Sequence, residues 1–226
     1  MIHTFENSAL RHSFNQKFKY SIFEKNYKTK LQLPRLTSFI LKNEKNIMEK
    51  TKKELSRFIK ESPGWVDGNT GLGLKSLTSR SPLYNLVEFK EMKYLKKIIH
   101  DAHDEFLKEL NIDDIDQLYI KCWANVMRKG DKINTHFHAG NNYDYLSGHI
   151  CVSTKDTHTY YLQPYYKNVF SSQNVPGKLT LFPSWIEHYT DEVKTNKERI
   201  TIAFDLRGEE SYQEDIYPHM KHHWQN

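Results

Sequence analysis

Apolar residues follow two different periods along this chain. In the first half they recur every three or four residues, at about residues 47–59 and 89–110, which predicts two amphipathic helices. From about residue 118 to residue 206 they alternate with polar residues, which predicts short β-strands. Helices therefore come first and a β-rich core second. The expected fold class is mainly β with a helical prelude.

The predicted strands are short and evenly spaced, and turn residues such as Pro176-Gly177 separate them. We expect strands at Leu118–Met127, Ile133–His138, Tyr145–Ser153, Thr159–Leu162, Lys178–Phe182 and Ile200–Leu206. This spacing favours a sandwich or a barrel of the jelly-roll type. We expect one domain over residues 1–226, with an N-terminal arm and helical prelude at 1–117, a β core at 118–206 and a polar tail at 207–226. The first 35 residues are read as an extended arm or a short strand.

Composition narrows the possible partners. The 226 residues carry a formal net charge of +5 with scattered lysines, which is typical of a solvated surface and does not favour a nucleic-acid partner. No run of about 18 apolar residues exists, so no membrane helix is expected, and the N-terminus lacks an apolar stretch of signal-peptide length. Two cysteines, Cys122 and Cys151, fit a reducing compartment. We expect a cytoplasmic protein and leave a homodimer open.

Histidines carry the first chemical signal. Residues i and i+2 of a strand point to the same face, so His136 and His138 can reach one point inside a barrel, while Phe137 points away. A third histidine, His188, follows fifty residues later. Three imidazoles can bind iron, copper or zinc and leave coordination positions open. The H-x-H pair alone is a weak signal in a chain with 12 histidines.

A basic and a hydroxyl residue carry the second signal. Arg199 and Thr201 are again i and i+2, at the start of an apolar strand. A buried arginine beside a hydroxyl can bind a carboxylate through two parallel hydrogen bonds, with the hydroxyl as a further donor. An arginine on a strand is more often the structural partner of an acidic residue, so it is the combination with the three histidines that indicates a site.

The order and spacing of these motifs resemble the Fe(II)- and 2-oxoglutarate-dependent oxygenases, and most closely the bacterial and phage group of 2-oxoglutarate-Fe(II) oxygenases. The resemblance covers residues 123–206 and is most specific around His188 and Arg199. It is carried by Trp123–Val126, Gly130-Asp131, His136–His138, Leu146–Gly148, Gly177–His188 and Glu198–Phe204, and less specifically by Arg80–Leu86.

The resemblance implies a double-stranded β-helix, also called a jelly roll and cupin-like, with the helical prelude packed on one sheet. It implies Fe(II) held by the first histidine motif and by His188. It also implies 2-oxoglutarate as co-substrate, with its distal carboxylate on Arg199 and Thr201. Oxidative decarboxylation to succinate, with O2, would then be coupled to oxidation of a second substrate.

The chain departs from the common metal triad of two histidines and one carboxylate. His138 stands where an Asp or Glu is commonly found. Either the site has three histidines, or one of His136 and His138 leaves the metal. In the second case Asp144, from a loop that looks inserted, would supply the carboxylate.

A second departure concerns the co-substrate wall. Many members of this family carry two tyrosines soon after a Ser-Gly pair, whereas this chain has His149-Ile150-Cys151. We expect His149 or Cys151 to point inward in place of a tyrosine, depending on the strand register. Asn125 is a further candidate for the wall of the co-substrate or substrate site, with a structural role near a turn as the alternative.

Three functions remain open from the sequence. The first is an oxygenase that hydroxylates a protein or peptide side chain or a free amino acid, and the primary substrate is unknown. The second is a cupin-like three-histidine metal enzyme without 2-oxoglutarate, which the Arg199-Thr201 pair disfavours. The third is a non-catalytic jelly-roll interaction module, which the retained histidines and Arg199 disfavour.

Overall fold

A computed structural model describes residues 21–43, 77–78, 85–112, 118–138, 144–154, 156–162 and 169–208. The helix predicted at 47–59 and most of the predicted C-terminal tail lie outside these residues. So does the predicted Arg80–Leu86 motif up to residue 84.

Strands dominate the described chain. They are β1 (Phe23–Asn26), β2 (Leu77–Thr78), β3 (Leu118–Met127), β4 (Asp144–Ser153), β5 (His158–Leu162), β6 (Val169–Gln173), β7 (Lys178–Pro183), β8 (His188–Thr190) and β9 (Arg199–Gly208). Residues 33–43 are helical, η1 (Leu86–Glu88) is a 3-10 turn and α3 (Tyr94–Glu109) is the helix after it. None of the described helices is both long and apolar enough to cross a membrane.

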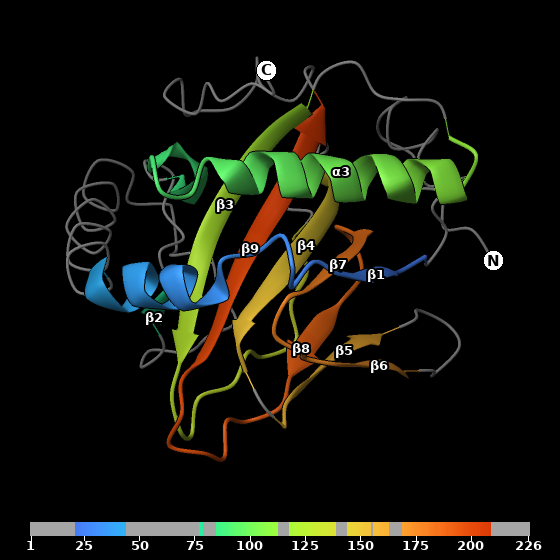
Figure 1. The fold of residues 1–226 in the computed structure, drawn as a ribbon. Helices are drawn as coiled ribbons and strands as arrows, with labels where there is room; N and C mark the ends of the chain where they lie inside the picture. Colours follow the sequence, from blue (N-terminus) through green and yellow to red (C-terminus); the bar gives the residue numbers. More distant parts are fainter. Residues whose placement is uncertain are drawn as a thin grey trace, which may run out of the picture.

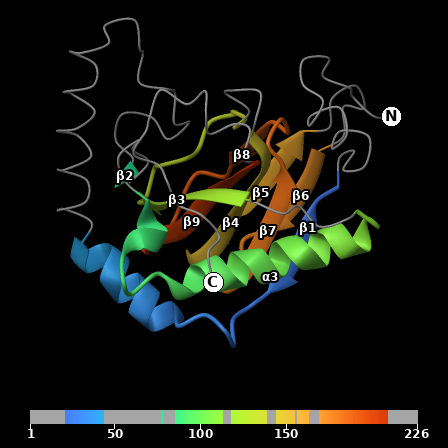
Figure 2. The ribbon, with the colours of Figure 1, turned by 90° about the horizontal axis from the view of Figure 1, so that it is seen from above.

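The strands form two antiparallel sheets (Figure 1). The larger sheet has the order β1-β7-β4-β9-β3-β2 and the smaller one the order β6-β5-β8. Helix α3 and the helix at residues 33–43 lie on the same side of the larger sheet, and the smaller sheet lies on its other side (Figure 2). The larger sheet is therefore the middle layer of the molecule.

Alternation along the strands gives the two faces of this sheet different chemistry. On β9, the residues Ile200, Ile202, Phe204 and Leu206 are buried in the same apolar core as α3. The residues between them, Arg199, Thr201, Ala203 and Asp205, belong to the opposite face, toward the smaller sheet. Burial of the apolar face against helices drives folding, which leaves the polar face for a site.

Helix α3 packs its predicted stripe onto this sheet. Leu95, Ile99, Ala102 and Phe106 are all buried in the main core. The helix begins later than the period predicts, at Tyr94. The preceding segment forms tight turns with hydrogen bonds three residues apart, from the Met92 N–H to the Phe89 carbonyl and from the Leu95 N–H to the Met92 carbonyl.

Other elements differ from the sequence prediction. Ile133–His138 is not a continuous strand, because this segment makes one isolated bridge, between His136 and His188. Strand β6 was not predicted, because its sequence Val-Phe-Ser-Ser-Gln does not alternate between apolar and polar residues. Strand β8 was not predicted, because it has only three residues. Within the N-terminal arm, the short strand is present as β1, paired with β7.

Candidate metal centre and co-substrate pocket

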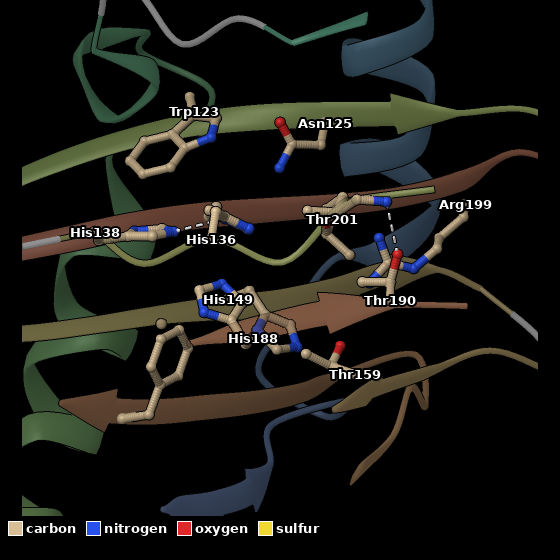
Figure 3. A pocket seen from close by; sticks show the side chains of 14 residues that line it. Trp123, Asn125, His136, His138, His149, Thr159, His188, Thr190, Arg199 and Thr201 are labelled. Atoms are coloured by element: carbon tan, nitrogen blue, oxygen red, sulfur yellow. Dashed lines mark hydrogen bonds between the residues drawn. The ribbon is translucent and has the colours of Figure 1, made fainter. Parts of the chain in front are cut away.

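A pocket lies between the two sheets (Figure 3). It is lined by the inner face of β3, β4 and β9, which is the face toward the smaller sheet. All seven residues predicted for the site line it, together with further residues from both sheets. The complete lining is Trp123, Asn125, Ile133, His136, His138, Gly148, His149, Thr159, Phe182, His188, Thr190, Arg199, Thr201 and Ala203.

Three imidazoles meet in this pocket. One ring nitrogen from each of His136, His138 and His188 lies within 4.8 Å of the other two. The Nε2 atoms of His136 and His138 are 3.2 Å apart. Two nitrogens bound to one metal at about 2.1 Å and at right angles would be about 3.0 Å apart. The spacing therefore fits a shared metal ion.

Backbone pairing brings the H-x-H segment to His188. The His136 N–H donates to the His188 carbonyl at 3.1 Å, and the His188 N–H donates to the His136 carbonyl at 2.9 Å. Two residues on, the His138 N–H donates to the Ser184 carbonyl at 2.9 Å. The segment thus stays extended enough for His136 and His138 to share a face, as predicted, although it is not a regular strand.

The other ring nitrogen of two of these histidines is held by a backbone carbonyl. His136 Nδ1 lies 2.8 Å from the Asn134 carbonyl oxygen, and His188 Nδ1 lies 3.1 Å from the Ile186 carbonyl oxygen. A carbonyl only accepts, so each Nδ1 carries the proton and each Nε2 offers a lone pair. Metal-binding histidines in proteins are held in this way.

The donor set fits a cation. Burial, and then the neighbouring His136 and His138, lower the pKa of His188 well below its usual value, so its ring stays neutral. Neutral imidazole is the form that binds metals. Lone pairs of His136 and His138 that face each other at 3.2 Å repel unless a proton or a cation lies between them. These residues could therefore hold a metal ion.

Sequence reasoning missed a buried carboxylate beside this cluster. Asp205 on β9 is fully buried, and its Oδ1 lies 2.5 Å from His138 Nδ1. Its position continues the alternation that placed Arg199 and Thr201 on one face, and this signal could have identified it. The alternative carboxylate, Asp144, begins β4, and its side chain lies outside the described residues.

Arg199 is buried without an acidic partner in the part of the chain that the structure describes. Its side chain is 3% exposed, its Nη1 lies 3.0 Å from Met127 Sδ, and its Nε has no hydrogen-bond partner. Burial lowers the pKa of its guanidinium from the usual value, which is the mark of an uncompensated charge. Thr201 lies next to it on the same face and also lines the pocket. This arrangement suits a bound carboxylate.

Two polar side chains, one on each of the strands that flank β9, line the pocket beside Arg199. Asn125 stands opposite Thr201 in the β3–β9 register, and its Oδ1 is buried without a partner. His149 on β4 likewise has a buried Nε2 without a partner. Burial and the nearby Arg199 lower the pKa of His149 to about 3, so it is neutral. His149 lines the pocket, whereas Cys151 on the same face contacts Asn174.

A buried tyrosine that the sequence analysis did not assign lies behind His188. Tyr161 on β5 is fully buried, and its ring stacks on His188 with 5.9 Å between centroids. Phe182 contacts both rings, with its centroid 5.0 Å from that of Tyr161 and 4.7 Å from that of His188. The rings of Tyr161 and Phe182 thus form an apolar wall on one side of the three histidines.

Part of the chain matches a known protein family in sequence. Residues 144–205 match the family model described as "Putative 2OG-Fe(II) oxygenase". No curated protein matches the chain in sequence. The matched range contains His188, Arg199 and Thr201, but it begins after His136 and His138.

Solved structures share the fold at low sequence identity. A prolyl-4-hydroxylase from Pseudomonas putida matches with a TM-score of 0.52 and 9% identity, over 86% of this chain and 96% of that one. A prolyl hydroxylase from Trichoplax adhaerens, in complex with a peptide fragment of hypoxia inducible factor, matches with a TM-score of 0.52 and 10% identity, over 87% and 88%.

A third structure has a different activity. The non-haem, α-ketoglutarate-dependent epimerase SnoN from nogalamycin biosynthesis matches with a TM-score of 0.54 and 9% identity, over 87% of this chain and 83% of that one. The family implies Fe(II) and 2-oxoglutarate, and the three histidines fit such a metal. The resemblance to the 2-oxoglutarate-Fe(II) oxygenases is thus confirmed, by the family model over residues 144–205 and by the fold over most of the chain.

Proposed function

We propose that this protein is an Fe(II)- and 2-oxoglutarate-dependent hydroxylase, and that its two sheets are the walls of a double-stranded β-helix. One observation carries the proposal. One ring nitrogen from each of three histidines converges in the same pocket as a buried arginine that has no acidic partner among the described residues. A metal chelate and a carboxylate anchor side by side are what a 2-oxoacid with a second carboxylate requires.

His136, His138 and His188 would hold the iron, and Arg199 and Thr201 the distal carboxylate of 2-oxoglutarate. When bound, the iron and 2-oxoglutarate supply the oxidising chemistry, with O2 as co-substrate and succinate and CO2 as products. The guanidinium of Arg199 presents a rigid fork of donors, so it fixes both the position and the orientation of the carboxylate. The hydroxyl of Thr201 adds a further donor.

The remaining inward residues shape the co-substrate wall. Asn125 Oδ1 and His149 Nε2 are buried without a partner within the described chain. Asn125 Oδ1 accepts a hydrogen bond, whereas His149 Nε2 can donate one to a bound carboxylate in the tautomer that carries its proton there. The rings of Trp123 and Phe182 lie beside His138, with centroids 5.7 and 6.2 Å away. These rings exclude water from one side of the three histidines, which strengthens the electrostatic interactions there.

The three-histidine cluster also suits a cupin-like metal enzyme that does not use 2-oxoglutarate. Arg199 argues against this function, since burying an unpaired guanidinium is costly unless a ligand neutralises it. An oxidation that needed only the metal and O2 would leave this charge without a role.

The reaction on the second substrate is proposed to be hydroxylation of a protein or peptide side chain or of an amino acid. Two of the structural neighbours are prolyl hydroxylases, and one of them binds a peptide. A third neighbour is an epimerase, so the fold alone does not select hydroxylation. The proposal therefore rests on 2-oxoglutarate turnover first and on substrate identity second.

The test is succinate release. Purified protein given Fe(II), ascorbate and 2-oxoglutarate under air should form succinate, and His188→Ala should not, because no neighbouring residue can replace this ligand. His158→Ala is a matched control, since this partly buried histidine of β5 pairs with Asp191 outside the pocket. Succinate formation that survives His188→Ala, or that never occurs in the wild type with any candidate peptide or amino acid, would contradict the proposal.

A further inference from the structure

The inner face of β9 carries two functional groups at a distance from each other. Arg199 stands at its start, and Asp205 six residues later on the same face. Asp205 is completely buried, yet it does not line the pocket itself. A buried carboxylate is costly unless hydrogen bonds compensate it, so its partners indicate its role.

Asp205 belongs to a closed ring of hydrogen bonds around His138. Its Oδ1 accepts from His138 Nδ1 at 2.5 Å and from the Ser147 hydroxyl at 2.8 Å. The Ser147 oxygen lies 2.8 Å from the Ser184 hydroxyl. The Ser184 carbonyl in turn accepts the His138 N–H at 2.9 Å. The backbone and the ring of His138 are thus held by the same small network.

His138 differs in this respect from the other two histidines. His136 and His188 are each held at Nδ1 by a neutral backbone carbonyl, whereas His138 is held by a carboxylate. A carboxylate is the stronger acceptor and raises the basicity of the opposite nitrogen. His138 is also the residue that stands where relatives commonly have an acidic ligand.

We propose that Asp205 is a positioning residue of the metal centre: it fixes the ring and the tautomer of His138. The carboxylate that the common triad has as a ligand would here lie behind the imidazole ring of His138, hydrogen-bonded to its Nδ1. This inference rests on the proposed function. It predicts that Asp205 acts on the metal only through His138.

The first experiment measures Co(II) and, without oxygen, Fe(II) binding to the metal-free protein by calorimetry. Asp205→Asn keeps the size and an acceptor oxygen but removes the charge. Affinity is expected to fall by about 10- to 100-fold, as for other partners of metal-binding histidines. In a His138→Ala background the same Asp205→Asn change should alter affinity by less than about twofold, because the histidine that transmits the effect is gone.

A purely structural role gives a different pattern. Lys121 stands opposite Asp205 in the β3–β9 register, so a structural Asp205 would act by facing this lysine. Lys121→Met is therefore the control, and it should leave metal affinity unchanged whatever it does to the unfolding temperature. Equal losses of metal affinity in Lys121→Met and Asp205→Asn would overturn the inference.

A second measurement needs no variant of Asp205, in case Asp205→Asn does not fold. In the Zn(II)-loaded wild type, proton NMR should show the His138 Nδ1 proton far downfield and slow to exchange, as expected for a short bond to a carboxylate. The absence of this resonance, with the His136 and His188 Nδ1 protons visible, would overturn the inference.

The outcomes separate the two proposals. If the wild type binds Co(II) and Fe(II) but Asp205→Asn binds them equally well, the role of Asp205 is wrong and the metal site stands. If the wild type binds neither metal, the proposed function fails, and the inference fails with it.

Discussion

At the scale of single residues, the arginine in the pocket decides between a 2-oxoglutarate site and a plain metal site. Arg199→Lys keeps the positive charge but loses the planar fork of donors. Losing one charge-assisted hydrogen bond costs about 1.5–3 kcal/mol, so the apparent 2-oxoglutarate concentration for half-maximal succinate formation should rise about 10- to 100-fold. Co(II) affinity without 2-oxoglutarate should not change. An unchanged 2-oxoglutarate titration would make Arg199 structural.

The identity of the third metal ligand is also decided by single residues. His138→Ala should weaken Co(II) binding far more than Asp144→Ala, because the Nε2 of His138 already lies 3.2 Å from that of His136. His138→Asp should retain binding, since it rebuilds the common triad. Calorimetry on the three variants measures this order. Loss of metal in Asp144→Ala with retention in His138→Ala would assign the carboxylate instead.

At the scale of elements, Gly148 on β4 is crowded by both neighbouring strands, β9 and β7. A Cβ added at Gly148 would lie 2.4 Å from Phe204 Cζ and 2.6 Å from the Thr180 carbonyl oxygen. The phenyl ring can shift, but the backbone oxygen cannot. Glycine at this position therefore lets Phe204 pack on the helix side of the sheet while His149, the next residue, faces the pocket.

Gly148→Ala should lower the free energy of unfolding by about 1–3 kcal/mol, which is the usual cost of overpacking a core. Urea unfolding followed by tryptophan fluorescence measures it. The double change Gly148→Ala with Phe204→Leu should recover no more than part of the loss, since the contact with the Thr180 carbonyl remains. Wild-type stability in Gly148→Ala would show that the Phe204 ring and the Thr180 carbonyl can both move aside at no cost.

A comparison of the predicted and observed strands shows how much of the structure could be predicted from the sequence. Period-2 alternation predicted β3 at its observed bounds, and β4, β5, β7 and β9 within two residues of theirs at each end. It put Arg199 and Thr201 on one face and left open whether His149 or Cys151 points inward, and in the structure Arg199, Thr201 and His149 line one pocket with the three histidines. It could not predict that His136 pairs with β8 by a single bridge, because that pairing depends on contacts fifty residues apart. The same alternation puts Asp205 on the face of Arg199 and Thr201, but the contact of Asp205 with His138 joins residues 67 apart in the chain, so the sequence does not show it.

At the scale of the whole molecule, a polar and partly titratable layer is buried between two sheets. His149 and His188 are neutral in the folded protein, since burial lowers the pKa of His149 to about 3 and that of His188 well below its usual value. In the unfolded chain each takes up a proton near pH 6.5. Their contribution to stability is complete above that pH and falls as the pH drops below it, toward the folded pKa values.

The metal-free protein should therefore lose stability between pH 7.5 and pH 5, by about 2 kcal/mol for each such histidine. His149→Gln should remove one share of this loss, as measured by urea unfolding at both pH values. An equal pH dependence in wild type and His149→Gln would show that His149 takes up its proton without unfolding.

The alternation of apolar and polar residues on β9 also determines its register against the neighbouring strands during folding. A slip of this strand by one residue against β3 or β4 would turn every one of its side chains to the opposite face. Arg199 and Asp205 would then enter the apolar core beneath α3, and Ile200, Ile202 and Phe204 would fill the pocket. Two buried charges without partners would make such a conformer unstable. A misregistered chain thus loses stability and also loses the Arg199 and Asp205 side chains from the face toward the pocket, so a single register of β9 is favoured.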